Sequence, residues 1–421
     1  MIAKKNEDNY LLYLFVGAIV YTIGYEIVHP QYKSFGHFVG MMGVCCSFYF
    51  YTRCCLDYLF DTDRTIQVIL KIFIFYAFVV IFRGLLNGIN SGTLIDILTQ
   101  KRGVLGYLTP LVLLYFVKFS DIRLIFRVCY IACYISIIFC VLNFREIFLT
   151  SHTDVLVGSW EDIFEAGVNN GQIPGYFVLP SSLIILSYKF MPKKYLNVSL
   201  VAFILSLGAA ISYGRRSYVA FHLIILLFFL VHYFTSHRIQ AWQRFLLLTT
   251  LLSLGLVIFF LFSELSIFDV FLSRLGEDTR GGVEDEFFRS FRDKEVDWFW
   301  GRGIFGTYYS WSVSGKAGSF YRTVIETGYL QFILNGGIIV LVLYLFILLK
   351  ASFLGFFRTK NTLTKAFALY LFANVLFLQS GNSLEFTLKG VFIWLIVTIC
   401  NSKKWRNSIE DNNLLILKNM K

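Results

Sequence analysis

The sequence predicts an all-α, polytopic membrane protein: a bundle of about twelve transmembrane helices with one large extracytoplasmic loop capping it. Of its 421 residues, 57% are hydrophobic and only 15% are charged, whereas soluble domains average roughly 25% charged residues. The apolar residues form runs close to the roughly 20 residues that a spanning helix needs. The longest polar stretch follows the ninth run. Cytosolic enzymes, secreted disulfide scaffolds and disordered tails are excluded.

Each predicted span is an apolar run of about spanning length with few charged residues. The first begins at Tyr10 without a signal-peptide cleavage pattern, so it is expected to be a retained span. The predicted spans are 10–28, 35–52, 65–82, 104–119, 124–143, 175–190, 196–213, 217–234, 245–263, 327–349, 364–380 and 386–401.

The orientation of the protein in the membrane follows from the Lys and Arg residues between the apolar runs. With a cytoplasmic N-terminus, 19 Lys and Arg residues fall in inner segments and 7 in short outer connections. Short cytoplasmic loops carry such an excess. We therefore expect a multi-pass protein of the bacterial inner membrane with both termini cytoplasmic.

Three regions follow from this topology. Region 1–263 holds spans 1–9 and an acidic outer loop at about 144–174. Region 264–326 is the extracytoplasmic cap loop, which is too long to be structureless and is expected to contain short helices. Region 327–421 holds spans 10–12 and a cytoplasmic tail.

The net charge, the cysteines and the histidines indicate which binding partners and metal sites to expect. The net charge of +11 is assigned to loops facing anionic lipid, so membrane lipids and not nucleic acid are the expected partners. The eight cysteines lie in or beside apolar spans, as small helix residues do. The six histidines lack a ligand spacing. We predict no metal site and no cofactor.

The most unusual charges are Arg215 and Arg216, in the tight turn SYGRRS between spans seven and eight. They lie on the side that should avoid cations. Free backbone N–H groups and the dipole of the eighth helix already attract an anion there. Two guanidiniums make this turn a candidate phosphate site. The alternative is that both reach lipid phosphates.

The cap loop supplies further candidates. Arg274, Arg280, Arg302 and Arg322 are candidate substrate contacts, although interspersed acids allow ordinary solvated pairs. The stretch 298–306 (WFWGRGIFG) combines glycines, which allow close backbone approach, with aromatic faces that suit sugar rings or lipid. A packed loop is the alternative reading.

Two acidic features follow the ninth span: one residue at the boundary of span ten, and one patch earlier in the cap loop. Glu326 is a candidate general base for a hydroxyl group, or the salt-bridge partner of Arg322. The patch 284–286 (EDE) is read as a solvated face, with a divalent cation as the alternative.

These motifs resemble the bacterial O-antigen polymerase and ligase family, the Wzy-like membrane glycosyltransferases. The shared features are twelve spans, a large outer loop between spans nine and ten, and an Arg-bearing turn before span eight. The segments 278–280 (DTR), 297–306 (DWFWGRGIFG) and 326–337 (ETGYLQFILNGG) resemble family motifs. Glu326 stands where ligase members carry a histidine, which favours a polymerase, and the usual proline before the Gly-x-Gly stretch is absent.

The resemblance implies a metal-independent, inverting glycosyl transfer on the face toward the periplasm or exterior. Donor and acceptor would be oligosaccharides linked to undecaprenyl pyrophosphate, and the product O-antigen, capsule or exopolysaccharide. Arg215 and Arg280 would stabilise the leaving pyrophosphate and Glu326 would act as base. The other expected substrate contacts are Arg216, Arg274, Arg302, Arg322, Trp298, Trp300 and Tyr329. The resemblance also implies a chain-length regulator as a candidate protein partner.

Two rival functions stay open. An O-antigen ligase would transfer the finished glycan to a lipid A core or a protein. A flippase or other transporter of lipid-linked oligosaccharides is the rival of another class. Transporters are often built from two structural repeats, and no matching halves are found here.

Overall fold

The computed structural model describes residues 10–28, 33–56, 64–86, 103–115, 117–118, 121–149, 173–213, 215–236, 281–292, 294–311, 320–325, 327–380 and 384–408. The chain forms two compact units. Unit 1 comprises Met1–Val128 and Asp278–Lys421, and unit 2 comprises Cys129–Glu277. The border falls within α6 (Asp121–Leu142).

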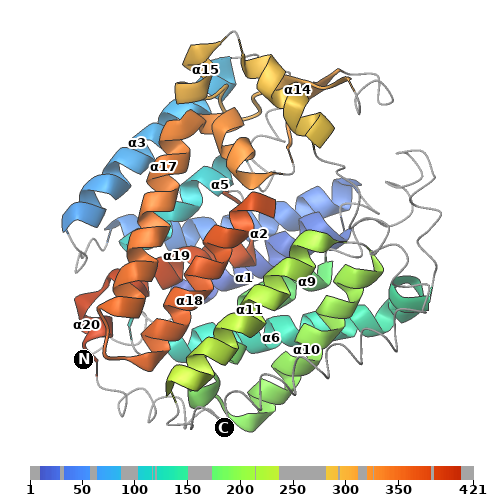
Figure 1. The fold of residues 1–421 in the computed structure, drawn as a ribbon, viewed down its shortest axis with the longest axis vertical. Helices are drawn as coiled ribbons and strands as arrows, with labels where there is room; N and C mark the ends of the chain where they lie inside the picture. Colours follow the sequence, from blue (N-terminus) through green and yellow to red (C-terminus); the bar gives the residue numbers. More distant parts are fainter. Residues whose placement is uncertain are drawn as a thin grey trace. The chain divides into compact units, whose positions relative to one another are not determined.

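Unit 1 is built around three helices of the C-terminal third, α17 (Gly328–Phe357), α18 (Thr362–Phe377) and α19 (Leu388–Asn401) (Figure 1). Nearly every residue of α19 is buried, so this helix forms the centre of the unit. Thr387 caps α19 by accepting the Gly390 N–H, and Asn361 caps α18 by accepting the Leu363 N–H. The remaining helices are α1 (Tyr10–Thr22), η2 (Ile23–Val28), α2 (Lys33–Leu56), α3 (Arg64–Leu86), α5 (Val104–Leu108), η3 (Thr109–Leu114), α14 (Gly281–Phe291), α15 (Glu295–Trp300), η6 (Leu378–Ser380) and α20 (Lys403–Arg406).

Unit 2 contains α9 (Ile173–Leu186), α10 (Lys193–Ser212) and α11 (Arg216–Ser236), which pack against one another. Small polar side chains lie in its interior: Ser181 donates from Oγ to the Cys129 carbonyl at 2.7 Å. Small residues let membrane helices approach closely. The elements of unit 2 after α6 are η4 (Arg145–Leu149), α9 (Ile173–Leu186), η5 (Tyr188–Phe190), α10 (Lys193–Ser212) and α11 (Arg216–Ser236).

The helices have the character of membrane spans. Within the described part of the chain, five helices are long and apolar enough to cross a bilayer: Gln67–Leu86, Asp121–Leu142, Lys193–Ser212, Arg216–Phe234 and Gly328–Phe357. Large apolar side chains also lie on their outer faces. On α3, Phe75, Phe78 and Phe82 are all exposed at helical spacing. Such faces suit lipid rather than water.

Most predicted spans are helical over much of their length, but the count of twelve spans stays a prediction, because four of the described apolar helices are shorter than a full span: Tyr10–Tyr25, Val104–Leu114, Thr362–Phe377 and Leu388–Asn401. Span 245–263 lies outside the described residues. In the predicted span 104–119, helix ends at Leu114 and Tyr115 is extended. Pro110, which lacks an N–H donor, is the second residue of the 3₁₀ segment Thr109–Leu114. These eleven helical residues cover only about 20 Å, less than the roughly 30 Å of a hydrocarbon core.

The cap loop contains one element that the all-α prediction missed. The described part holds α14 and α15, as expected, and also an antiparallel hairpin of β1 (Tyr308–Tyr309) and β2 (Tyr321–Arg322). Tyr308 pairs with Arg322, and Tyr309 with Tyr321. Aromatic residues favour strands, but strands of two residues are too short to show an alternating pattern in sequence.

Candidate functional site

The Arg215–Arg216 doublet in unit 2 lies at the beginning of α11. The Arg215 carbonyl accepts hydrogen bonds from the N–H groups of Tyr218 (3.0 Å) and Val219 (3.2 Å), so Arg215 is the N-cap residue. Arg216 is the first residue of the helix. A cation at this end of a helix opposes the macrodipole at a cost of about 0.3–1 kcal/mol. The local structure is therefore a poor place for two cations and a good place for a bound anion.

The turn before this doublet is held by backbone hydrogen bonds. The Arg215 N–H donates to the Ala210 carbonyl at 2.7 Å. This bond spans six residues, as in a Schellman motif that ends a helix, and the sequence supplies Gly214 between the two helices. Because the bonds involve backbone atoms only, they fix the position of residue 215 whatever its side chain.

Side chains anchor the same turn to η4. Ser212 donates from Oγ to the Ile147 carbonyl. Ile147 and Tyr213 also belong to a buried cluster with Cys140 and Ala209. The arginine turn is thus attached to a packed part of unit 2 on its side facing η4.

Tyr213 and Glu146 are neighbours of the arginine turn that sequence reasoning did not identify. Tyr213 is buried, and its hydroxyl interacts electrostatically with the Glu146 carboxylate and the Arg215 guanidinium. Both charges therefore act on the same hydroxyl. The sequence held a signal for Tyr213, which directly precedes the Gly-Arg-Arg segment. It held none for Glu146 beyond its place in an acidic loop.

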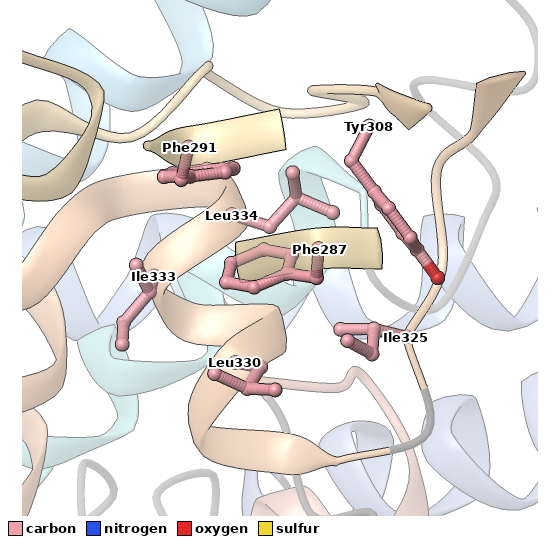
Figure 2. Packing of buried hydrophobic residues seen from close by; sticks show 7 residues of the cluster. All are labelled: Phe287, Phe291, Tyr308, Ile325, Leu330, Ile333 and Leu334. Carbon is pink, nitrogen blue, oxygen red and sulfur yellow. The ribbon is translucent and has the colours of Figure 1, made fainter. Parts of the chain in front are cut away.

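In unit 1 the cap has its own hydrophobic core (Figure 2). Phe287 and Phe291 of α14 stack with ring centroids 4.4 Å apart, and Phe287 meets Tyr308 at 5.6 Å. These rings pack on the first turns of α17, against Leu330 and Leu334. The complete cluster is Phe287, Phe291, Tyr308, Ile325, Leu330, Ile333 and Leu334. The cap is thus a packed structure on the N-terminal part of α17.

The predicted sugar contacts Trp298, Trp300 and Tyr329 differ in surroundings. Trp298 packs against the cap core and donates from Nε1 to the Phe291 carbonyl at 3.1 Å, so it supports the scaffold. Tyr329 packs against the same core and is partly buried. Trp300 is exposed and stacks on Tyr76 of α3 with centroids 5.5 Å apart. Of the three, Trp300 is the one that presents an exposed ring.

The Gly-x-Gly stretch contacts a break in α17. Gly337 has φ 70° and ψ −176°, which interrupts the helix and frees carbonyl groups in the turn before it. The Arg302 N–H donates to the Leu334 carbonyl at 2.7 Å and the Gly303 N–H to the Asn335 carbonyl at 2.9 Å. A Cβ atom at Gly301 would lie 2.5 Å from the Asn335 carbonyl. The predicted close backbone approach is present, and its partner is α17.

The Arg302 side chain holds the cap together. Nε forms an ion pair with Asp297 at 2.9 Å, and Nη1 donates to Ser290 Oγ (2.9 Å) and the Thr307 carbonyl (2.6 Å). Nη2 donates to the Ser290 carbonyl at 2.6 Å. The guanidinium also lies 4.2 Å from the centroid of Phe291. These contacts favour a scaffold role for Arg302 over substrate binding.

We expect Arg302→Lys to loosen the cap. Lysine lacks the planar fork that reaches three partners at once, so the cap should lose about 2–4 kcal/mol of local stability. Hydrogen exchange of 281–311 in the intact protein would measure this loss. Arg292→Lys is the matched control, because Arg292 is exposed near the end of α14. Unchanged protection in the Arg302 variant would contradict the scaffold role.

The acidic patch is only partly a solvated face. Glu284 accepts a hydrogen bond from the Thr327 hydroxyl, and Glu286 accepts one from Ser310 Oγ at 2.7 Å. Asp285 is exposed. Two of the three carboxylates therefore tie α14 to the N-cap of α17 and to the residue after β1. Among the described residues, no cluster of three or more His, Cys, Asp or Glu side chains is arranged to hold a metal ion.

Gln331 shapes the chain segment just before Glu326. Its Oε1 accepts the Ile325 N–H at 2.8 Å, and its Nε2 donates to the Thr323 carbonyl at 3.3 Å and to Asn335 Oδ1 at 3.1 Å. Together with the Glu284–Thr327 hydrogen bond, these contacts fix both chain neighbours of residue 326. Sequence reasoning used Gln331 only as part of the YLQ segment.

The other predicted residues fall into two groups. Arg322 is in β2, half-buried, and its guanidinium has no hydrogen bond or ion pair within the part of the chain that the structure describes. Glu326, Arg274 and Arg280 lie outside the described residues.

Comparison with known proteins identifies no relative of this chain: no family model, no curated protein and no solved structure matches it.

Proposed function

We propose that the protein is a membrane glycosyltransferase that polymerises oligosaccharide repeat units carried on undecaprenyl pyrophosphate. The observation that carries the proposal is the placement of Arg215 and Arg216 at the N-cap and first position of α11. Two guanidiniums at a helix N-terminus suit a diphosphate, whose charge rises as the glycosidic bond breaks.

The proposed reaction is an inverting displacement at the anomeric carbon of the donor. A hydroxyl oxygen of the acceptor sugar forms the new bond to that carbon while the bond from the carbon to the pyrophosphate oxygen breaks. The electron pair leaves with the undecaprenyl pyrophosphate. Arg215 stabilises its charge, with Arg216 in support. The acceptor proton passes to a carboxylate, for which Glu326 is the candidate base.

The cap arginines receive unequal roles in this proposal. Arg322 is the better candidate for a second phosphate contact, because no described residue engages its guanidinium. Arg302 is assigned to the scaffold by its four hydrogen bonds. Arg280 and Arg274 keep the roles that the family resemblance implies.

The proposal also requires a particular orientation in the bacterial inner membrane. It needs twelve spans, cytoplasmic termini and an arginine turn on the periplasmic or exterior face. Labelling of a cysteine introduced at position 215 with a membrane-impermeant reagent tests this. Protection from outside and labelling only from the inner compartment would contradict the proposal.

The activity itself is tested with purified protein in nanodiscs and lipid-linked repeat units. We expect a ladder of lengthened lipid-linked glycans without added metal or nucleotide. Transfer of a finished glycan to lipid A core or protein, without lengthening, would identify a ligase. Movement of the lipid across a vesicle membrane without any new glycosidic bond would identify a transporter.

A further inference from the structure

The cap hairpin carries four exposed aromatic side chains that contact one another. The Phe320 ring lies between Tyr309 and Trp311, with centroid distances of 5.8 and 5.7 Å and interplanar angles of 16° and 18°. Tyr321 meets Tyr309 edge-on at 5.9 Å. We call Tyr309, Trp311, Phe320 and Tyr321 the hairpin stack.

The hairpin stack is separate from the hydrophobic core of the cap. Neighbouring residues of a strand point to opposite faces. Tyr308 is fully buried in the core, whereas the next residue, Tyr309, is 41% exposed. Trp311 is 69% exposed and Tyr321 is 63% exposed. Since Phe320 has a ring on each side, Trp311 ends the row of parallel rings and offers the largest open aromatic surface.

The backbone beneath the hairpin stack is fixed. Ser310, between Tyr309 and Trp311, is fully buried, donates from its N–H to the Phe320 carbonyl at 2.9 Å and from Oγ to Glu286 at 2.7 Å. Rigid aromatic side chains on a fixed backbone lose little conformational entropy when they bind a ligand. Four exposed rings held in this way are more than the cap needs for its own packing.

The surroundings of the hairpin stack favour a carbohydrate over a membrane. The flanking residues Thr307 and Thr323 are polar and exposed. In the sequence, the eight residues between Trp311 and Phe320, 312–319 (SVSGKAGS), include a lysine and no aromatic or long aliphatic side chain. A segment that enters lipid would carry large apolar side chains. Flat aromatic faces beside hydroxyl groups suit ligands with one apolar face and a polar rim, as pyranose rings have.

We propose that the hairpin stack is a carbohydrate-binding platform, with the open face of Trp311 stacking on a pyranose ring of the glycan. Its role rests on the proposed function: it would hold sugars of a lipid-linked chain while the pyrophosphate is bound elsewhere. Loss of the platform should therefore shorten the products without abolishing single transfers.

Binding to soluble glycan tests the platform directly. The probe is a set of oligosaccharides of two or more repeat units, released by mild acid from the surface polysaccharide of the producing strain. The full-length protein in nanodiscs should bind them, and Trp311→Ala should raise the dissociation constant about 10-fold. Trp311→Phe should stay within about 3-fold of wild type, because it keeps an aromatic face. Phe288→Ala is the control for losing an exposed ring outside the stack, and it should bind normally.

Trp311→Leu separates the two chemistries, because leucine is apolar but has no aromatic face. A carbohydrate platform loses binding with leucine as with alanine. Wild-type glycan binding by the leucine and alanine variants would overturn the proposal. Quenching of Trp311 fluorescence by brominated lipids, measured as the difference between wild type and Trp311→Phe, would overturn it in favour of membrane insertion.

The platform and the proposed function fail in different ways. Arg215→Ala should retain glycan binding and lose chain extension, whereas Trp311→Ala should bind glycan about 10-fold more weakly and still join a first pair of repeat units. Normal extension by the arginine variant contradicts the catalytic proposal alone. Normal glycan affinity of the Trp311→Ala variant contradicts the platform alone.

Discussion

Arg215→Ala is expected to lower the rate of chain extension by roughly 100- to 1,000-fold, the usual effect of removing one donor that stabilises charge in a transition state. The guanidinium would neutralise the pyrophosphate as it leaves. The backbone of residue 215 caps α11 through its carbonyl, so alanine keeps the cap. In vitro extension of lipid-linked repeat units measures the effect, with size-exclusion chromatography as the check on folding.

Two variants make this result specific. Arg215→Lys keeps the charge but not the bidentate geometry, so we expect an intermediate rate. Lys193→Ala removes an exposed cation from the first position of α10 and should extend chains normally. Wild-type product length in the Arg215→Ala protein would refute the assignment.

Gly337→Ala is expected to destabilise unit 1 by about 2–6 kcal/mol, combining backbone strain with overpacking. With φ 70° and ψ −176°, Gly337 occupies a region that residues with a side chain rarely adopt. A Cβ atom there would lie 2.0 Å from the Phe299 carbonyl oxygen. Separating the two would displace α15 from α17. A lower apparent Tm and faster proteolysis of the cap are the expected readouts.

Gly282→Ala is the matched control for this variant. Gly282 lies in α14, and its Cβ atom would meet nothing within 4 Å. Alanine there should be neutral or should stabilise the helix by about 0.5–1 kcal/mol. Equal stability of the Gly337 and Gly282 variants would contradict the tight contact between α15 and the α17 break.

The helical nature and order of the long elements could be predicted because each depends on local information. An apolar run such as 196–213 must satisfy its own backbone hydrogen bonds in lipid, and a helix does so within one segment. The position of Arg215 at the start of α11 followed from the tight turn in the sequence. The predicted span 104–119 was longer than its helix because the effect of Pro110 on the chain around it was not considered.

The environment of the cap residues could not be predicted, since it depends on contacts between distant segments. Trp298 and Trp300 are two residues apart, yet one supports the core and the other is exposed on Tyr76. Nothing in the sequence distinguishes Arg302 from the other loop arginines, because its contacts with Ser290 and Thr307 form only in the folded chain. The hairpin was hidden because its strands are two residues long and eleven residues apart in sequence.

The sequence by itself determined that the protein is a helical chain with membrane spans and an arginine doublet at a helix start. Apolar length and helix ends are local properties of the chain, and they suffice for this. The tertiary structure decided which cap side chains are scaffold and which are exposed to a ligand. It did so because the break at Gly337 frees carbonyls to which the Gly301–Gly303 segment, over thirty residues earlier in the chain, donates hydrogen bonds.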